Sequence, residues 1–217
     1  MTDKNVCPTK HMVRDGIPYV VIPGVLALVA LLIGQWPFAI GFLGLTAFMA
    51  FFFRDPERTP PSEPGIIVSP ADGRVTRAGP VSEEEADSPL LVSIFLSPLD
   101  VHINRSPIAG RIVDISYTEG RFLMATNDKA SLLNEQNSLT IAGESLTVGC
   151  KQIAGILARR IVCWKKIGDE VALGERFGMI KFGSRTDLIL PPEVDLMVSK
   201  GMHVRGGSTV IGRIRPR

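Results

Sequence analysis

The chain has 217 residues, which is enough for one domain with a hydrophobic core plus an appendage but not for two large domains. Its 24 Lys and Arg residues nearly balance its 22 Asp and Glu residues, so the net charge of +2 argues against a nucleic-acid-binding protein. The three cysteines, Cys7, Cys150 and Cys163, are odd in number and lack C-x-x-C spacing. We therefore expect no disulfide framework, no metal site and a reducing compartment.

A hydrophobic segment near the N-terminus predicts a membrane anchor. Residues 17–53 contain no Asp, Glu, Lys or Arg. As one straight helix they would span roughly 55 Å, well beyond a hydrocarbon core of about 30 Å. The Gly34-Gln35-Trp36-Pro37 sequence interrupts the segment and divides it into two apolar arms. We therefore predict a helical hairpin in the membrane.

Basic residues on both sides of this segment predict its orientation. Lys4, Lys10 and Arg14 precede it, and Arg54 and Arg58 follow it, so the positive-inside rule assigns both flanks to the cytoplasm. A cleavable signal peptide and a buried core hairpin are the alternatives, but the run is long for a signal peptide and lacks a small-residue cleavage site. The predicted organisation is a cytoplasmic N-terminus (1–16), a membrane hairpin (17–53) and a globular domain (54–217).

The globular part consists of short apolar runs separated by Gly and Pro. Strands are predicted at residues 66–69, 91–96, 111–116, 138–148 and 160–164, and helices near 128–135 and 151–157. A weak repeat relates residues 168–174 (GDEVALG) to residues 201–207 (GMHVRGG), and both read as hairpin turns similar to those of lipoyl and biotinyl carrier domains. No lysine occupies a carrier-type tip. We expect a mostly β (α+β) domain, a compact β-sandwich or barrel.

Among the three histidines, His102 is the best candidate for an acid or base. His11 precedes the membrane segment, whereas His102 follows an apolar strand where polar residues begin, and such positions often carry reactive groups. A structural histidine bonded to Asp100 is the alternative. Asp72, in an Asp-Gly turn, reads most simply as a turn residue, but a carboxylate that orients a histidine needs the same kind of position.

The Gly183-Ser184 pair follows a short apolar strand. Glycine can adopt strained backbone angles, and it leaves its carbonyl accessible to attack by the following hydroxyl. Such pairs are common, so this one alone is a weak signal.

Six motifs together carry a specific resemblance. In order and approximate spacing, they resemble the short prokaryotic form of the phosphatidylserine decarboxylases: FFFRDPER (51–58), SPADGRV (69–75), FLSPLDVHINRSP (95–107), NEQN (134–137), QIAGILARRI (152–161) and GERFGMIKFGSRTD (174–187). The hydrophobic hairpin before FFFRDPER is also similar to that family. The resemblance covers nearly the whole chain.

The resemblance implies a self-processing enzyme. Members of the family cut themselves at a Gly-Ser bond, here Gly183–Ser184, into a β chain (1–183) and an α chain (184–217) that stay associated. The serine becomes a covalent pyruvoyl group, the only cofactor implied, which condenses with the serine headgroup amine and accepts the electrons released as CO2 leaves. The family's Asp, His and Ser triad falls on Asp72, His102 and Ser184.

The chain departs from the family pattern at two positions that bear on these assignments. The Gly207-Ser208 pair resembles the cleavage tetrapeptide of longer members, but the Gly-rich pattern that precedes the cleaved serine ends here at Ser184. Longer members also have a second histidine where this chain has Arg105. We therefore expect His102 to act in both maturation and decarboxylation. Arg105 and Arg54 are candidates for binding the lipid phosphate or membrane headgroups.

The resemblance also implies partners and location. These are phosphatidylserine, converted to phosphatidylethanolamine, and the cell (inner) membrane with the catalytic domain on its cytoplasmic face; a homodimer is compatible with the sequence. Two other classes remain open on the residues alone. A membrane serine peptidase would use the same three residues and react with fluorophosphonates, and a non-enzymatic headgroup-binding protein would leave Ser184 uncleaved.

Overall fold

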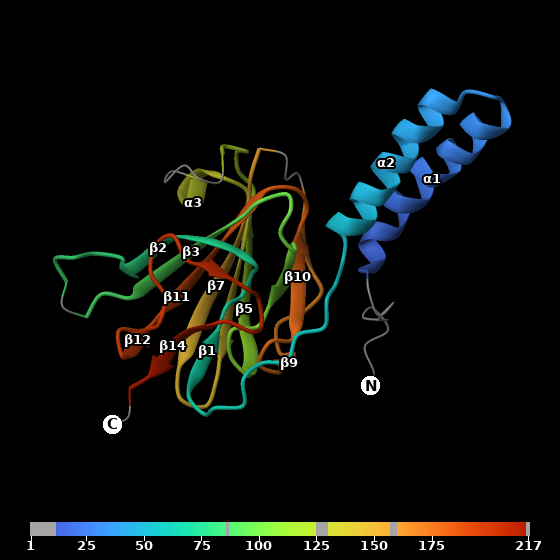
Figure 1. Ribbon diagram of the computed structural model, residues 1–217. Helices are drawn as coiled ribbons and strands as arrows, with labels where there is room; N and C mark the ends of the chain where they lie inside the picture. Colours follow the sequence, from blue (N-terminus) through green and yellow to red (C-terminus); the bar gives the residue numbers. More distant parts are fainter. Residues whose placement is uncertain (1–11, 86, 125–129, 157–159, 216–217) are drawn as a thin grey trace. The chain divides into compact units, whose positions relative to one another are not determined.

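The computed structural model describes residues 12–85, 87–124, 130–156 and 160–215 (Figure 1). The chain divides into two units, Met1–Glu57 and Arg58–Arg217. The described residues do not include four residues named in the sequence analysis: Lys4, Cys7, Lys10 and His11.

The N-terminal unit is the predicted helical hairpin. A short 3-10 turn, Arg14–Gly16, leads into α1 (Ile17–Leu32), and α2 (Trp36–Phe52) packs against α1. Gly34, with φ of +75°, makes the turn between the helices, and α2 starts with Pro37 in its first turn. The break predicted at residues 34–37 is therefore confirmed.

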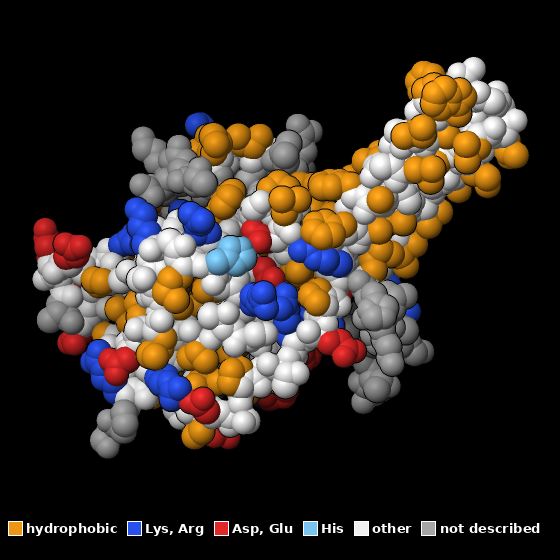
Figure 2. Space-filling view, in the orientation of Figure 1, with side chains coloured by type: hydrophobic (Ala, Val, Ile, Leu, Met, Phe, Trp, Pro, Cys, Tyr) orange, Lys and Arg blue, Asp and Glu red, His pale blue; other side chains and the backbone are white. Residues whose placement is uncertain are grey.

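Most apolar side chains of the hairpin point outward. Ala27, Ala30 and Ala39 are buried at the helix contact, whereas Leu32 is 77% exposed and Phe38 is 65% exposed. Figure 2 shows hydrophobic side chains over the surface of this unit. The helix Arg14–Leu32 is long and apolar enough to cross a bilayer, and Trp36–Phe52 is apolar but shorter. A surface that is apolar on all sides is expected for helices in contact with lipid.

The second unit is mostly β, as predicted. An eight-stranded sheet, ordered β13-β2-β3-β11-β7-β6-β5-β9, curls into a half-barrel, and two three-stranded sheets, β1-β14-β12 and β4-β10-β8, complete the unit. The elements are β1 (Ile66–Val68), β2 (Gly73–Pro80), β3 (Leu90–Leu96), β4 (Ile103–Arg105), β5 (Gly110–Thr118), α3 (Ala130–Leu133), β6 (Gln136–Ala142), β7 (Thr147–Ala154), β8 (Ile161–Cys163), β9 (Glu170–Val171), β10 (Arg176–Ile180), β11 (Ser184–Leu190), β12 (Val194–Leu196), β13 (His203–Val204) and β14 (Val210–Ile214).

The strand order reveals an internal duplication with approximate twofold symmetry. Reading the large sheet from either edge gives equivalent strands: β13 and β9, β2 and β5, β3 and β6, and β11 and β7. The two small sheets correspond in the same way. The second repeat, β4 to β10, is inserted between β3 and β11 of the first repeat.

Backbone details obey the same symmetry. Val68 N–H donates to the Pro107 carbonyl and Arg105 N–H donates to the Pro70 carbonyl, both at 2.9 Å. The Gly residues of the predicted repeat also agree: φ is +95° and +73° at residues 168 and 174, and +97° and +71° at residues 201 and 207. The weak repeat in the sequence is thus part of a duplication of the whole unit.

Three predicted elements need correction. The helix expected at 151–157 is wrong, because residues up to Ala154 belong to β7 and residue 157 lies outside the described residues. The strand expected at 138–148 is two strands, β6 and β7, joined by a turn in which Gly143 N–H donates to the Leu146 carbonyl. Of the helix expected at 128–135, only α3 is helical, and residues 128 and 129 are not described.

The core of this unit lies on the inner face of the half-barrel. Its buried side chains come from both repeats and from the small sheets, and include Ile94, Ile112, Leu139, Phe177 and Leu188. Alternate residues of β11 face this core, so Ser184, Thr186 and Leu188 share one face of the strand. Ser184 therefore opens a strand whose position is fixed by the packing of its later residues.

Candidate active site

A strained turn precedes Ser184. Phe182 has φ of +63° and Gly183 has φ of +57°, and Phe182 is the only non-glycine residue with positive φ among those described. Left-handed backbone angles are costly for residues that carry a Cβ and often occur at functional sites. Ser184 then pairs with Leu96 of β3 and Ala154 of β7. The Gly183–Ser184 peptide thus joins a strained turn to a firmly held strand.

The Ser184 hydroxyl is buried without a hydrogen-bond partner. The residue is fully buried, and its Oγ has no partner among the described residues. Buried hydroxyls are nearly always hydrogen-bonded, and an exception calls for an explanation. An Oγ that is free of competing hydrogen bonds beside a strained peptide is available to act as a nucleophile.

His102 lies against the turn before Ser184. Its side chain is buried between the end of β3 and the start of β4, and its Nε2 accepts a hydrogen bond from Gly183 N–H at 3.2 Å. Its Nδ1 lies 2.9 Å from the Asp100 carbonyl oxygen. A ring nitrogen that accepts a hydrogen bond must be unprotonated, so in the neutral ring Nδ1 carries the proton and donates a hydrogen bond to the Asp100 carbonyl oxygen. The lone pair of Nε2 therefore faces the turn that contains the candidate bond.

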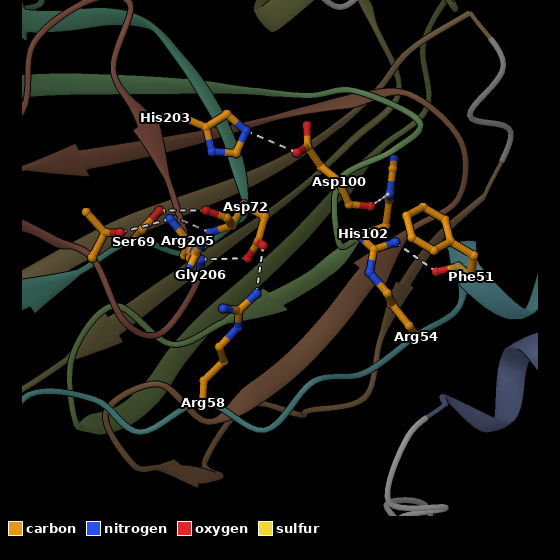
Figure 3. Close-up of polar contacts among 12 residues, drawn as sticks. Phe51, Arg54, Arg58, Ser69, Asp72, Asp100, His102, His203, Arg205 and Gly206 are labelled. Carbon is orange, nitrogen blue, oxygen red and sulfur yellow. Dashed lines mark hydrogen bonds and ion pairs between the residues drawn. The ribbon is translucent and has the colours of Figure 1, made fainter.

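Asp72 is buried in the turn before β2 (Figure 3). Its Oδ2 accepts from Arg58 Nη2 at 2.9 Å, and its Oδ1 accepts from Gly206 N–H at 2.7 Å. Burial raises the pKa of the Asp72 carboxyl, although the Arg58 guanidinium and the Gly206 N–H act in the opposite direction. In this arrangement the group that meets His102 Nδ1 is the Asp100 carbonyl, and Asp72 holds the 205–209 turn.

A second histidine lies beside Asp100. His203 Nε2 is 3.2 Å from Asp100 Oδ1 (Figure 3). Ser97 N–H donates to Asp100 Oδ2 at 2.8 Å. Asp100 therefore contacts His102 through its backbone and His203 through its side chain. The His203 side chain is 57% exposed, so it is open to solvent where His102 is not.

The two candidate phosphate-binding arginines are engaged by backbone carbonyls. Arg105 is 4% exposed, and its Nη1 donates to the Gly174 carbonyl at 3.2 Å. Its side chain passes so close to Gly207 that a Cβ there would lie 2.8 Å from Arg105 Cδ. Arg54, in the N-terminal unit, donates to the Phe51 carbonyl at 2.8 Å and stacks over the Phe51 ring.

The rival Gly207–Ser208 pair lies in a compact turn. Ser208 and Thr209 N–H groups both donate to the Arg205 carbonyl, and Gly207 N–H donates to the Ser69 carbonyl at 2.8 Å. Gly207 has φ of +71°, the value expected of its equivalent Gly174, so its backbone angle belongs to the duplicated turn. The hydrogen bond between His102 Nε2 and the backbone of a Gly-Ser pair is made at the other pair, by Gly183 N–H.

A buried chain of amides supports the site from within. Asn137 Nδ2 donates to Gln152 Oε1, Gln152 Nε2 donates to Asn104 Oδ1, and Asn104 Nδ2 donates to Thr186 Oγ1, each at 2.9 Å. This network links three strands of the second repeat, β6, β7 and β4, to Thr186 of β11 in the first repeat, two residues after Ser184. Such a fully satisfied buried network favours one arrangement of its strands.

An ion pair holds the opposite face of β11. The Arg185 guanidinium binds the Asp187 carboxylate through two hydrogen bonds, of 2.6 and 3.0 Å, and donates to Ser93 Oγ at 2.8 Å. Sequence reasoning missed this pair and the amide chain. The sequence did contain a signal. Residues two apart in a strand lie on the same face, so Arg185 and Asp187 could have been predicted to pair, and Thr186 to lie on the face of Ser184.

Comparison with known proteins identifies the family. Residues 45–212 match the family model described as phosphatidylserine decarboxylase. The chain is 49% identical to a phosphatidylserine decarboxylase proenzyme of Solibacter usitatus over 203 residues, which cover 93% of this chain and 96% of that protein. It is 46% identical to one of Symbiobacterium thermophilum (93% and 94% covered) and 42% identical to one of Geotalea uraniireducens (91% and 94% covered). A match of this extent, over a mostly β unit with a serine at a strained Gly-Ser peptide, means that the chain belongs to the phosphatidylserine decarboxylase family and is an enzyme of that family.

Proposed function

We propose that the chain is a proenzyme that cuts itself at Gly183–Ser184 and then decarboxylates phosphatidylserine to phosphatidylethanolamine and CO2 with a pyruvoyl group formed from Ser184. The observation that carries this proposal is the contact between His102 Nε2 and the Gly183 N–H, beside a buried Ser184 Oγ without a partner. Base, nucleophile and strained peptide are the three requirements of an activated acyl transfer.

Self-cleavage follows from these groups. His102 Nε2 accepts the Ser184 hydroxyl proton as Oγ attacks the Gly183 carbonyl carbon, and the C–N bond breaks to leave an ester and a free amine on residue 184. Loss of the Ser184 Cα proton then expels the Gly183 carboxylate and leaves dehydroalanine. Addition of water releases ammonia and leaves a ketone at residue 184.

The surroundings of Ser184 fit a pyruvoyl group. A Cβ built at Gly183 would have no atom within 4 Å, so space is available on this side of the peptide. When formed, the group supplies a carbonyl that takes the substrate amine and acts as an electron sink. In this proposal the same His102 Nε2, which contacts the Gly183 N–H, returns a proton to the substrate carbon that has lost CO2.

The remaining residues have supporting roles in this proposal. Asp72, through Arg58 and Gly206, holds the turn beside the site, and the Asp100 carbonyl orients His102. A phosphate-binding role for Arg105 stays a proposal, and would require the guanidinium to exchange its bond to the Gly174 carbonyl for one to phosphate. Arg54, at the end of α2, is the corresponding candidate for membrane headgroups.

The location proposed is the inner membrane. The apolar hairpin would anchor the chain, and the basic flanks assign the second unit to the cytoplasmic face. The β and α chains would stay associated, because β11 pairs on both sides with strands of the β chain and β14 pairs with β1. A homodimer is compatible with this arrangement.

Intact mass under denaturing conditions tests the proposal. We expect two chains, with the C-terminal one beginning at residue 184, blocked to Edman degradation and trapped on the substrate amine by cyanoborohydride. A serine peptidase would instead remain one chain and react with a fluorophosphonate. A single intact chain that decarboxylates the lipid would exclude the pyruvoyl mechanism.

A further inference from the structure

Exposed apolar side chains gather at the end of the large sheet where Ser184 lies. Leu132 is 79% exposed, Met124 60%, Ile156 51%, Leu133 41% and Phe122 38%. Figure 2 shows hydrophobic side chains at the surface near α3. We call these five residues the apolar rim. Exposed apolar patches of this kind mark sites of interaction with proteins or membranes.

Hydrogen bonds connect the apolar rim directly to the strand partner of Ser184. Arg121 N–H donates to the Leu133 carbonyl at 2.7 Å, and Leu123 N–H donates to Asn134 Oδ1 at 2.9 Å. The Asn134 side chain then donates to the Ala154 carbonyl at 2.7 Å. Ala154 is the residue of β7 that lies opposite Ser184. The rim is therefore one layer of contacts away from the candidate catalytic residue.

The base of the rim is firmly packed. Ala130 is fully buried and Asn134 is 1% exposed, and the Asn134 amide bonds on both sides to neighbouring segments. The outward direction of Leu132 and Met124 thus belongs to an ordered surface. Their exposure to water costs free energy that a nonpolar partner would recover.

Two exposed cations accompany the rim. Arg121 begins the segment that leads to Met124. The Arg160 carbonyl accepts a hydrogen bond from Lys181 N–H at 3.2 Å, and Lys181 lies three residues before Ser184 in the chain. A surface that combines apolar side chains with Arg matches the boundary of a bilayer that contains anionic lipid.

We propose that the apolar rim inserts into the headgroup and upper acyl region of an anionic bilayer and brings Ser184 to the depth of the lipid headgroup. The inference rests on the proposed lipid substrate. A lipid withdrawn completely from the bilayer would expose its acyl chains to water, and insertion of the rim beside the site avoids this cost. The contact is additional to the helical hairpin.

Fluorescence quenching tests the insertion without any turnover. Leu132→Trp and Ile167→Trp are made in full-length Ser184→Ala protein whose two native tryptophans are replaced by Phe (Trp36→Phe, Trp164→Phe), so that the added tryptophan is the only one. Both proteins are reconstituted into phosphatidylcholine and phosphatidylserine vesicles with brominated acyl chains. Ile167 is 61% exposed in the turn that contacts Ile112, near β9 and away from α3. We expect bromolipid to quench the added tryptophan at 132 and not at 167. Equal quenching at both positions, or cross-linking of position 132 between two copies without quenching, would overturn the proposal.

Activity provides a second, independent measurement. Met124→Gln with Leu132→Asn is compared with Ile167→Asn with Met197→Gln, all exposed residues. On vesicles we expect kcat/KM of the rim variant to fall about tenfold, whereas on monomeric short-chain phosphatidylserine it should match the wild type. An equal loss on both substrates would indicate a folding effect and overturn the proposal. Intact mass monitors self-cleavage separately, so failure of the pyruvoyl proposal is distinguishable.

Discussion

His102 Nε2 accepts a hydrogen bond from the Gly183 N–H at 3.2 Å, across a separation of 81 residues in the chain. This contact joins the loop before β4 to the turn between β10 and β11. Because Nδ1 donates to the Asp100 carbonyl, the neutral ring keeps a lone pair directed at the peptide before Ser184. The two ring nitrogens therefore differ in role. Nδ1 holds the ring against the backbone, and Nε2 is the nitrogen that would accept a proton in the proposed self-cleavage.

Replacement of His102 tests this arrangement. His102→Ala should slow self-cleavage about 100- to 10,000-fold, since it removes a general base. His203→Ala is the matched control, because His203 contacts the Asp100 side chain but is largely exposed. Time courses of the two cleavage products on gels measure both rates. Normal processing of His102→Ala together with a block in His203→Ala would transfer the role of base to His203.

Two serine variants distinguish the candidate bonds. Ser184→Ala should remain one chain, whereas Ser208→Ala should release residues 184–217 normally, because Ser208 lies in a compact turn. Intact mass of the C-terminal product separates the two bonds, since cleavage before Ser208 would release only residues 208–217. The appearance of that shorter product would contradict the assignment.

The left-handed backbone of Phe182 should contribute to the cleavage rate. Its φ of +63° costs about 1–2 kcal/mol for a residue with a Cβ, and Phe182→Gly removes that cost from the uncleaved state. We expect cleavage to slow about tenfold. Phe182→Leu keeps the Cβ and loses the ring, so it should cleave at the wild-type rate. Equal slowing in both variants would assign the effect to the aromatic ring.

The buried Asp72 carboxyl predicts a pH dependence of stability. Burial raises its folded pKa above the ordinary value of about 3.9, so the folded state holds the proton more tightly than the unfolded chain. The stabilisation is complete below about pH 3.9 and is lost as the pH rises through the folded pKa. In Ser184→Ala protein, the difference in free energy of unfolding between Asp72 and Asp72→Asn should therefore shrink from pH 4 to pH 7.

Arg58 provides a control for the same measurement. Its guanidinium lowers the pKa of Asp72, so Arg58→Met should raise that pKa further and extend the loss of stability to higher pH. Urea unfolding in detergent across this range measures both effects. A difference between Asp72 and Asp72→Asn that grows with pH would contradict the prediction.

Reporter fusions test the orientation of the hairpin. Because basic residues flank residues 17–53 on both sides, fusions before residue 17 and after residue 53 should both report a cytoplasmic location, and the chain should fractionate with membranes. A periplasmic signal from one flank alone would replace the hairpin with a single span.

The sequence predicted those features of the fold that depend on the residue types at a single position. Gly34 adopts a φ of +75° and Pro37 lies in the first turn of α2, and both positions are typical of these residue types, so the break in the hairpin was readable. The end of β7, residues 151–154, was misread as part of a helix. Gln152 is buried in the amide chain, and a polar residue inside the core obscures the alternation of a strand.

The duplication was readable only in part. The glycines of residues 168–174 and 201–207 revealed one pair of turns, whereas the matching Ser-Pro-x-x-Gly sequences at 69–73 and 106–110 were overlooked. The structure relates these two segments by reciprocal hydrogen bonds. A nested repeat separates equivalent segments by different distances in the chain, which conceals a single period.

The candidate site, too, was predictable only in part from the sequence. Ser184 and His102 stand in recognisable motifs, but their proximity depends on how β4 and β11 meet, and no local pattern encodes it. The Asp100 contact uses a backbone carbonyl, which any residue type could supply. The sequence analysis named Asp100 as a partner of His102 only in the structural alternative, and that the bond uses the backbone carbonyl of Asp100 was not predictable.

The nested duplication has a consequence for the range of motion of the reactive group. In the second repeat a tight turn connects β6 to β7. In the first repeat the equivalent strands, β3 and β11, are separated by the whole inserted repeat. Ser184 is the residue at which the chain re-enters the first repeat. The proposed cleavage there would cut the chain at a junction between repeats and leave every strand of the three sheets complete. Ser184 is paired with Leu96 and Ala154, so a terminus formed there would have no free segment on which to swing. Carrier domains with similar hairpins move their reactive group on a long lysine arm; here the group would be stationary, and the lipid must travel the whole distance to it.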